Sequence, residues 1–358
     1  MLNETAAATD EAALKQLYAE FAAAHLAPLW TQRAGLMPEQ PRPAAAPALW
    51  RWRTLFRLAA RSGELVPVGR GGERRAIALA NPGLPGTAYA TPTLWAAIQY
   101  LGPGEQAPAH RHSQTAFRFV VAGEGVWTNV EGDPVAMRRG DLLLTPSMHF
   151  HEHHNTTDQP MAWLDGLDIP LVSQLDAGFF EEGPETLGTR DTPAASRNER
   201  LWAHPGLRPV GAPASPASPL MAYRWENTDA ALAAQLALES EGFPGVLGPG
   251  HAVVRFTNPA TAGDALSTMR TEMHRLRAGA RTATTRTVGS AVWQIFDGSG
   301  TVTVGEQSYE VTAGDIFAVP SWAPLTVASE TGLDAFRFSD EPVYEAIGLA
   351  RTHREEQA

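Results

Sequence analysis

The chain has 358 residues, 44% of them hydrophobic and 19% charged, and its formal net charge is −11. This composition is typical of a folded protein of one or two domains, and the acidic balance argues against a nucleic-acid-binding surface. Cysteine is absent, which excludes disulfides and thiolate metal ligands. The sequence has neither a run long enough to span a bilayer nor a secretory signal, so we expect a cytoplasmic protein that contacts no membrane.

Residues 1–60 are predicted to form a helical arm. Residues 11–26 carry apolar side chains at helical spacing, and Asp10 is placed to cap that helix. A proline-rich loop, residues 38–47, leads to a tryptophan-rich segment, residues 49–62. We interpret this segment as an amphipathic helix that packs on a barrel or on a neighbouring subunit.

Residues 66–80 place a group of arginines around a glycine-rich turn. The segment lacks the Gly-Lys-Ser/Thr ending of a phosphate-binding loop. Two interpretations stay open. The turn is a solvated basic loop, or Arg70 or Arg74 reaches from it to a substrate carboxylate.

The stretch from Gly104 to Asn155 holds six of the eleven histidines. His110 and His112 lie two residues apart on a predicted strand, so their side chains share one face. The sequence HFHEHHN repeats this alternation on a return strand that carries His151 and His153. Several imidazoles aimed into one interior predict a divalent-metal site, whereas the alternative of scattered core or surface histidines fits this density poorly.

The same alternation predicts what else faces the interior. Gln114, Ala116 and Arg118 follow His112 at even spacing. A buried arginine requires an anionic partner, and a bound carboxylate would supply one.

The chain then repeats itself after a less informative region, residues 173–245, which contains a loop-like stretch and a predicted helix. GDLLLTPSMHFHEH, from Gly140, is matched by GDIFAVPSWAPLTV, from Gly314. The alignment places Thr285, Thr287 and Leu325 where the first copy has His110, His112 and His151. It also places Trp293 where the first copy has Arg118. The second copy is therefore predicted to be a barrel without a metal.

The two histidine segments resemble the two cupin motifs. The first consists of Gly104, His110, His112, Ala116 and Gly123, and the second of Gly140, Pro146, Met148, His151 and Asn155. Ala116 stands where the cupin pattern has a glutamate ligand, and Met148 stands where it has a glycine. Three neutral imidazoles, His110, His112 and His151, would then hold the metal and leave one face open for substrate and oxygen.

From about residue 25 to 345 the chain is similar to the bicupin ring-cleaving dioxygenases, which act on gentisate, salicylate or 1-hydroxy-2-naphthoate. The resemblance implies a mostly β chain of two jelly-roll barrels (double-stranded β-helices) behind an N-terminal helical arm. The implied parts are the arm, residues 1–60; the metal-binding barrel, residues 61–172; a linker with a helix, residues 173–245; and the metal-free barrel, residues 246–358.

The resemblance also implies the chemistry. One Fe(II) per chain, without an organic cofactor, would serve O2-dependent cleavage between the carboxyl-bearing and hydroxyl-bearing ring carbons. Gentisate, whose second hydroxyl enriches the ring in electrons, would give maleylpyruvate, and the enzyme would be a homotetramer. Manganese and nickel stay open as metals. The implied catalytic residues are Arg118, His153 and Asp165, and the implied substrate-binding residues are Arg70, Arg74, Trp95, Gln99 and Arg118.

Other interpretations stay open. His149 and His154 are expected at the rim or exposed. The preferred acid could be salicylate or 1-hydroxy-2-naphthoate instead of gentisate. A metal-dependent cupin isomerase or decarboxylase, or a non-catalytic sugar-binding or storage bicupin, are the alternatives of other classes, and the intact set of three histidines disfavours the last.

Overall fold

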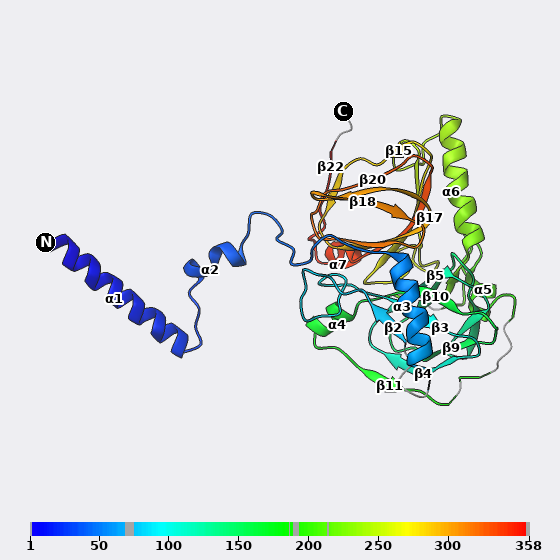
Figure 1. Cartoon of the computed structure of the whole chain (residues 1–358), viewed down its shortest axis with the longest axis horizontal. Coiled ribbons are helices and arrows are strands. Elements are labelled where there is room, and N and C mark those ends of the chain that lie inside the picture. Colours follow the sequence, from blue (N-terminus) through cyan, green and yellow to red (C-terminus); the bar gives the residue numbers. More distant parts are fainter. Residues whose placement is uncertain (1, 69–74, 186, 189–192, 213–214, 356–358) are drawn as a thin grey trace. The chain divides into compact units, whose positions relative to one another are not determined.

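The computed structural model describes residues 2–68, 75–185, 187–188, 193–212 and 215–355 (Figure 1). The contacts within the chain divide it into two units, Met1–Arg42 and Pro43–Ala358. The first unit consists of helices α1 (Leu2–Ala23) and α2 (Leu29–Leu36). Asp10 lies inside α1, so the prediction that it caps a helix is wrong, because the alanine-rich residues before it continue the helix. In the described part of the chain, no helix has the length and apolar character needed to cross a membrane.

The second unit contains two β-barrels and is mostly β, as predicted. The first barrel is built from a six-stranded sheet, in the order β12-β8-β5-β10-β3-β2, and a five-stranded sheet, in the order β11-β4-β9-β6-β7. Their bounds are β2 (Ala76–Ala78), β3 (Trp95–Leu101), β4 (Gln106–His112), β5 (Ala116–Ala122), β6 (Val126–Val130), β7 (Asp133–Ala136), β8 (Leu142–Thr145), β9 (His151–Asn155), β10 (Met161–Leu167), β11 (Phe180–Glu182) and β12 (Ala222–Tyr223).

The second barrel is an eleven-stranded sheet that curls on itself through the long strand β17. Its strands are β1 (Ala48–Trp50), β13 (His251–Arg255), β14 (Arg270–Leu276), β15 (Ala280–Arg281), β16 (Thr285–Thr287), β17 (Ala291–Val304), β18 (Gln307–Thr312), β19 (Ile316–Val319), β20 (Leu325–Ser329), β21 (Leu333–Ser339) and β22 (Thr352–Arg354). The helices of this unit are α3 (Trp52–Leu65), α4 (Ile169–Gln174), α5 (Arg197–Trp202), α6 (Trp225–Ser240) and α7 (Glu341–Ala346). The predicted boundaries at residues 60, 172 and 245 stay a prediction.

Each barrel receives one strand from the segment that precedes the other. Strand β1 comes before the first barrel in sequence but pairs with β19 of the second, and β12 comes before the second barrel but pairs with β8 of the first. The tryptophan-rich segment is therefore a strand followed by helix α3, and its prediction as one helix is only partly correct. Helix α3 packs on β3, and α6 packs on β13 (Figure 1).

The repeated Gly-Asp pairs secure these exchanged segments. Asp315 accepts a hydrogen bond of 2.9 Å from the backbone N–H of Trp52, the first residue of α3, and Asp141 accepts one of 3.0 Å from Trp225, the first residue of α6. Both carboxylates thereby satisfy a free N–H at the start of a helix. The preceding glycine is required by space, because a Cβ on Gly140 would lie 2.7 Å from the Trp225 ring.

Aromatic rings form the contact between the two barrels. Alternation along β5 turns Phe117 and Phe119 away from the interior of the first barrel, and the same alternation along β21 turns out Phe336 and Phe338. The rings of Phe119 and Phe336 stack at 4.1 Å, and those of Phe117 and Phe338 meet edge-on at 4.8 Å. All four side chains are fully buried, so these contacts hold the barrels together through apolar burial.

Candidate metal centre

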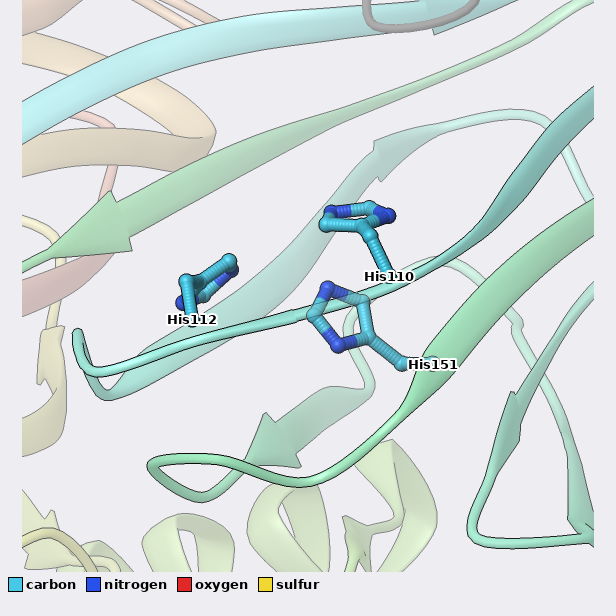
Figure 2. A group of neighbouring side chains, drawn as sticks. All are labelled: His110, His112 and His151. Carbon is cyan, nitrogen blue, oxygen red and sulfur yellow. The ribbon is translucent and has the colours of Figure 1, made fainter. Parts of the chain in front are cut away.

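Three histidines converge inside the first barrel (Figure 2). His110 and His112 lie on β4, and His151 lies on the neighbouring strand β9, directly opposite His110. The ring centroids of His110 and His151 are 4.3 Å apart, and those of His112 and His151 are 5.0 Å apart. One ring nitrogen from each of the three lies within 4.8 Å of the others, which is the spacing that a single bound ion requires.

Backbone carbonyls orient all three rings. The Nδ1–H groups of His110, His112 and His151 donate to the carbonyl oxygens of Pro108, Gln114 and His149 at 2.9, 2.8 and 3.0 Å. This places the proton on Nδ1 and leaves the Nε2 lone pair of each ring for a metal. The Nε2 atom of His151 is buried and has no hydrogen-bond partner among the described residues. A ligand ion is the group that would satisfy it.

The electrostatic surroundings keep His151 neutral. Burial lowers the pKa of His151 well below its ordinary value, and the positive charge of Arg118 lowers it further. A neutral imidazole can bind a cation without first losing a proton. Ala116, at the position of the cupin glutamate, contributes no anion, so the three imidazoles form an uncharged ligand set that suits a borderline divalent ion such as Fe(II).

Arg118 lies buried on β5 with a carboxylate of the chain beside it. Its Nε is 3.7 Å from Oδ1 of Asp165, and its Nη1 donates to the hydroxyl of Thr145. The sequence analysis treated residues 110–118 as one continuous strand. In the structure, β4 ends at His112, and β5 begins at Ala116 in the other sheet. Arg118 is nevertheless only 4% exposed. Its anionic partner within the chain is Asp165, so a bound carboxylate is not needed to explain its burial.

Asp165 can take up or release a proton near neutrality, while Arg118 stays protonated. Burial raises the pKa of Asp165 to about 7, although Arg118 and a 3.0 Å hydrogen bond from the Trp163 indole N–H both act to lower it. Burial also lowers the pKa of Arg118, and Asp165 counteracts this. A carboxyl group with a pKa near 7 is suited to proton transfer.

Strand β3 forms the part of the barrel wall next to Arg118 and Asp165. Ala97 lies opposite Asp165 on the neighbouring strand, and Gln99 lies opposite Trp163. Because alternate residues share a face, Trp95 and Gln99 point to the same side as Ala97. Gln99 is buried and Trp95 is half-buried. The other two predicted substrate-binding residues, Arg70 and Arg74, lie outside the described residues.

His153 is buried next to the metal ligands, and a threonine fixes its ring. Its Nδ1 lies 2.8 Å from the hydroxyl of Thr128, and this hydroxyl donates its own hydrogen to the sulfur of Met137 at 3.2 Å. The hydroxyl oxygen therefore accepts from Nδ1–H of His153, which leaves Nε2 as a hydrogen-bond acceptor. The sequence analysis missed Thr128, because its position opposite His153 depends on the register between β6 and β9.

The two remaining histidines of residues 104–155 differ in how deeply they are buried. His149 is half-buried, and its Nδ1–H donates to the carbonyl of Ser147. The expectation that His154 lies at the rim or exposed is wrong. Its ring is buried, stacks on Trp127 at 4.0 Å, and places Nε2 3.2 Å from a carboxylate oxygen of Glu152. Strand β9 is covered on both faces, so alternation does not bring His154 to solvent.

A short strand from the predicted linker also borders the site. Strand β11 pairs with β4, so that Phe180 lies opposite His112 and Glu182 lies opposite His110. The Phe180 ring stacks on His110 with a centroid distance of 5.7 Å. No sequence pattern predicted this strand, because its three residues show no recognisable alternation.

The second barrel reproduces the geometry without the ligands. Thr285 lies opposite Leu325 as His110 lies opposite His151, and Trp293 lies opposite Arg337 as Arg118 lies opposite Asp165. Within the described residues, the three histidines are the one group of His, Asp or Glu side chains arranged to hold a metal.

This difference gives a first prediction. Fully loaded protein is expected to contain one metal ion per chain, because the side chains of Thr285, Thr287 and Leu325 offer no imidazole, carboxylate or thiolate. Elemental analysis after removal of loosely bound metal measures the ratio. Two ions per chain would contradict the prediction, and a His110→Ala variant that still held one ion would place the site elsewhere.

Comparisons with known proteins agree with this geometry. The Cupin domain family matches residues 97–167. Gentisate 1,2-dioxygenase from Streptomyces sp is 69% identical over 99% of both chains, and 5-aminosalicylate 1,2-dioxygenase from Comamonas sp is 36% identical over 94% of this chain and 89% of its own length. The crystal structure of salicylate 1,2-dioxygenase from Pseudoaminobacter salicylatoxidans with gentisate has a TM-score of 0.94 at 58% identity and covers 96% of this chain and 94% of its own.

Proposed function

The chain belongs to the gentisate 1,2-dioxygenase family of bicupin ring-cleaving oxidoreductases, and from this premise we propose that it cleaves gentisate with O2 at an Fe(II) ion held by His110, His112 and His151. The product would be maleylpyruvate. The observation that carries the proposal is the set of three carbonyl-oriented imidazoles beside the buried Arg118. When bound, Fe(II) would supply the electron transfer that lets the ring react with oxygen, so that no organic cofactor is required.

The residues around the metal would bind and orient the substrate. Arg118 offers a buried positive charge for the substrate carboxylate, and Asp165 holds that charge in place before the substrate arrives. His153 presents an acceptor nitrogen that can accept a hydrogen bond from a ring hydroxyl. Gln99 and Trp95 would line the ring pocket on β3, and Arg70 and Arg74 are proposed to contact the carboxylate or the pocket entrance.

One experiment tests the proposal. The protein is loaded with Fe(II) without oxygen and then assayed for oxygen uptake and for the spectral change of ring opening with gentisate, salicylate and 1-hydroxy-2-naphthoate. One O2 consumed per gentisate opened supports the proposal. Turnover of gentisate without oxygen uptake would instead indicate an isomerase or decarboxylase. Parallel loading with manganese and nickel identifies the active metal.

The choice of acid gives a second prediction. Gentisate is expected to have a higher kcat/KM than salicylate, because its second hydroxyl makes the ring easier to oxidise. Ala97, opposite Asp165, is an ordinary small side chain and gives no special feature for a poorer substrate. Salicylate cleavage is the second candidate function, since a salicylate 1,2-dioxygenase is a solved relative at 58% identity. Equal or better efficiency with salicylate on one iron-loaded preparation would overturn the preference.

Thr128 gives a third prediction. Thr128→Val keeps the shape of the side chain but removes the oxygen that accepts from His153, so the imidazole loses the bond that fixes its tautomer. We expect kcat to fall about 10- to 100-fold with a bound metal still present, the range typical of lost support for a site histidine. Thr128→Ser keeps the hydroxyl and is the matched control, which should recover most of the activity. Equal loss in both variants would point to packing instead.

A further inference from the structure

A cavity of about 550 Å³ lies in the second barrel. Thr285, Thr287 and Leu325, the counterparts of the three metal ligands, form part of its wall. Protein interiors are close-packed, so a barrel with a purely structural role is expected to fill such a space with side chains. A cavity of this size is instead in the range of small-molecule sites. The second barrel has no metal-binding side chains at these three positions, but it contains a cavity there.

The register shows which polar groups replaced those of the first barrel. Trp293 stands at the place of Arg118, so a neutral N–H donor replaces a cation. Arg337 stands at the place of Asp165, and Glu272 opposite it stands at the place of Ala97. The first barrel thus offers a positive charge to a carboxylate, and the second barrel offers none at the same position.

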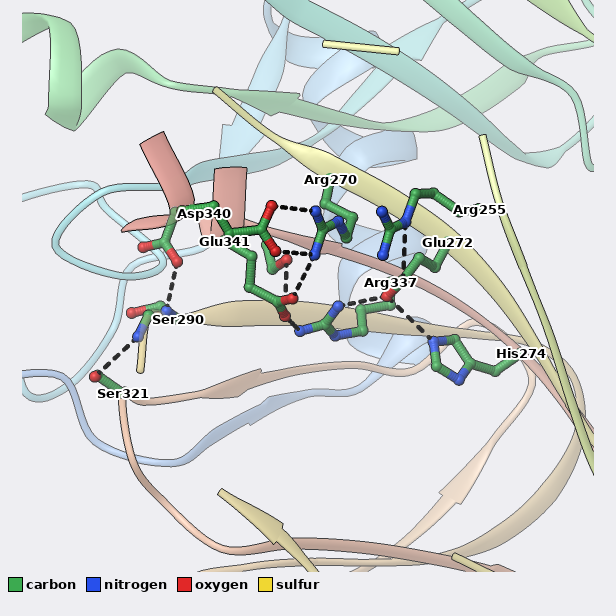
Figure 3. Close-up of polar contacts among 12 residues, drawn as sticks. Arg255, Arg270, Glu272, His274, Ser290, Ser321, Arg337, Asp340 and Glu341 are labelled. Atoms are coloured by element: carbon green, nitrogen blue, oxygen red, sulfur yellow. Dashed lines mark hydrogen bonds and ion pairs between the residues drawn. The ribbon is translucent and has the colours of Figure 1, made fainter. Parts of the chain in front are cut away.

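The buried charges of this wall are already paired with one another. Arg337 donates to the carboxylates of Glu272 and Glu341, and Glu341 also accepts from Arg270 at 2.9 Å (Figure 3). An ion entering here would lose its water without gaining a free counter-charge, which is costly. Arg281, Arg354 and Glu355 also line the cavity, but they are exposed, where solvent and salt screen their charges.

The two histidines in the wall are neutral as well. His251 and His274 form a hydrogen bond of 3.0 Å between their rings. Nε2 of His274 is also 3.7 Å from a carboxylate oxygen of Glu272, and Figure 3 shows this contact. Burial lowers the pKa of His251 to about 3, and burial also lowers the pKa of His274. Neither ring supplies a positive charge for an anion, in contrast to Arg118 in the first barrel.

The wall offers an apolar surface and a few hydrogen-bonding groups. Val253, Val319 and Val327 contribute aliphatic surface, and Thr285 and Thr287 contribute hydroxyls. The Nε1–H of Trp293, which also lines the cavity, is buried and has no hydrogen-bond partner among the described residues. A buried donor without a partner is unfavourable, and an acceptor oxygen on a ligand would satisfy it.

We propose that the cavity of the second barrel binds a compact, uncharged organic molecule with an apolar body and a carbonyl or hydroxyl oxygen. The oxygen accepts from the Trp293 indole and the Thr287 hydroxyl, while the body packs on the valines. This site is separate from the metal centre. The two sites differ in the charge of the ligand they prefer: the first barrel binds a carboxylate, and the second barrel binds an uncharged molecule.

A matched pair of probes tests this inference. Benzamide and benzoate share a ring and a carbonyl but differ in charge, and each is titrated calorimetrically into the full metal-loaded chain. Thr285→Trp fills the cavity, Trp293→Phe removes the donor while keeping an aromatic ring, and Arg118→Ala removes the anion-binding group of the first barrel. We expect benzamide affinity to fall about 10-fold or more in Thr285→Trp and about 3- to 10-fold in Trp293→Phe, and to be unchanged in Arg118→Ala.

Benzoate should respond in the opposite way, with a loss in Arg118→Ala and no change in Thr285→Trp. Benzamide binding that survives Thr285→Trp, that disappears in Arg118→Ala, or that is absent at millimolar concentration in the wild type would overturn the proposal. Retained ring cleavage shows that Thr285→Trp is folded. If this variant does not fold, a wild-type crystal soaked in benzamide decides, because an empty second cavity would also overturn the proposal.

Discussion

Replacing His110, His112 or His151 by alanine is expected to remove the metal and to reduce ring cleavage by more than about 100-fold, since losing even the partner of a metal ligand costs 10- to 100-fold. Each ring supplies one of three nitrogens that lie within 4.8 Å of one another, and no carboxylate among them can take over. Two imidazoles hold a divalent ion much more weakly than three. The measurements are metal content by elemental analysis and kcat with saturating gentisate.

The fold should survive these substitutions. The three rings contact one another and backbone carbonyls but are not part of the aromatic core between the barrels. His149→Ala is the matched control, because this half-buried histidine precedes the same strand and bonds a carbonyl in the same way, yet lies outside the triad. A triad variant with full metal content and normal turnover would refute the ligand assignment. Loss of metal in His149→Ala would show that the loop before β9, and not the three histidines alone, determines metal binding.

Arg118→Ala is expected to keep the metal but to bind and turn over the substrate poorly. Loss of a buried charge-assisted contact costs roughly 2–5 kcal/mol, which corresponds to a decrease of about 30-fold to several thousand-fold in kcat/KM. The effect should fall mainly on substrates with a carboxylate. Arg138→Ala, at an exposed arginine of the same barrel, is the control and should behave like the wild type.

The buried partner of Arg118 has to be considered in this experiment. Removing the arginine leaves Asp165 without its counter-charge, but the pKa of Asp165 is already about 7. Without Arg118 this pKa rises further, so Asp165 takes up a proton and no buried charge stays unpaired. The double variant Arg118→Ala with Asp165→Asn separates the two effects. If the double variant recovered normal kinetics, Arg118 would serve to neutralise Asp165 and not to bind substrate.

The sequence by itself identified the three histidines that converge in the first barrel, and it identified the residues that stand at their positions in the second copy. Spacing of two residues on a strand is a local property that directs His110 and His112 to one face, so no tertiary information was needed. The alignment of the two Gly-Asp segments likewise placed Thr285 and Leu325 at the ligand positions, and the structure pairs them across strands as it pairs His110 and His151. The mostly β class followed from the resemblance of the histidine segments to the cupin motifs.

The tertiary structure alone decided the surroundings of the metal. Asp165 beside Arg118, Thr128 beside His153, and strand β11 along β4 all join segments that are far apart in the chain, and their contacts depend on strand register. The exchange of β1 and β12 between the barrels is also non-local. Sequence periodicity predicts on which face of a strand a side chain lies. Its neighbours on that face depend on which strands pair and in which register, because the hydrogen bonds of a sheet form between distant segments.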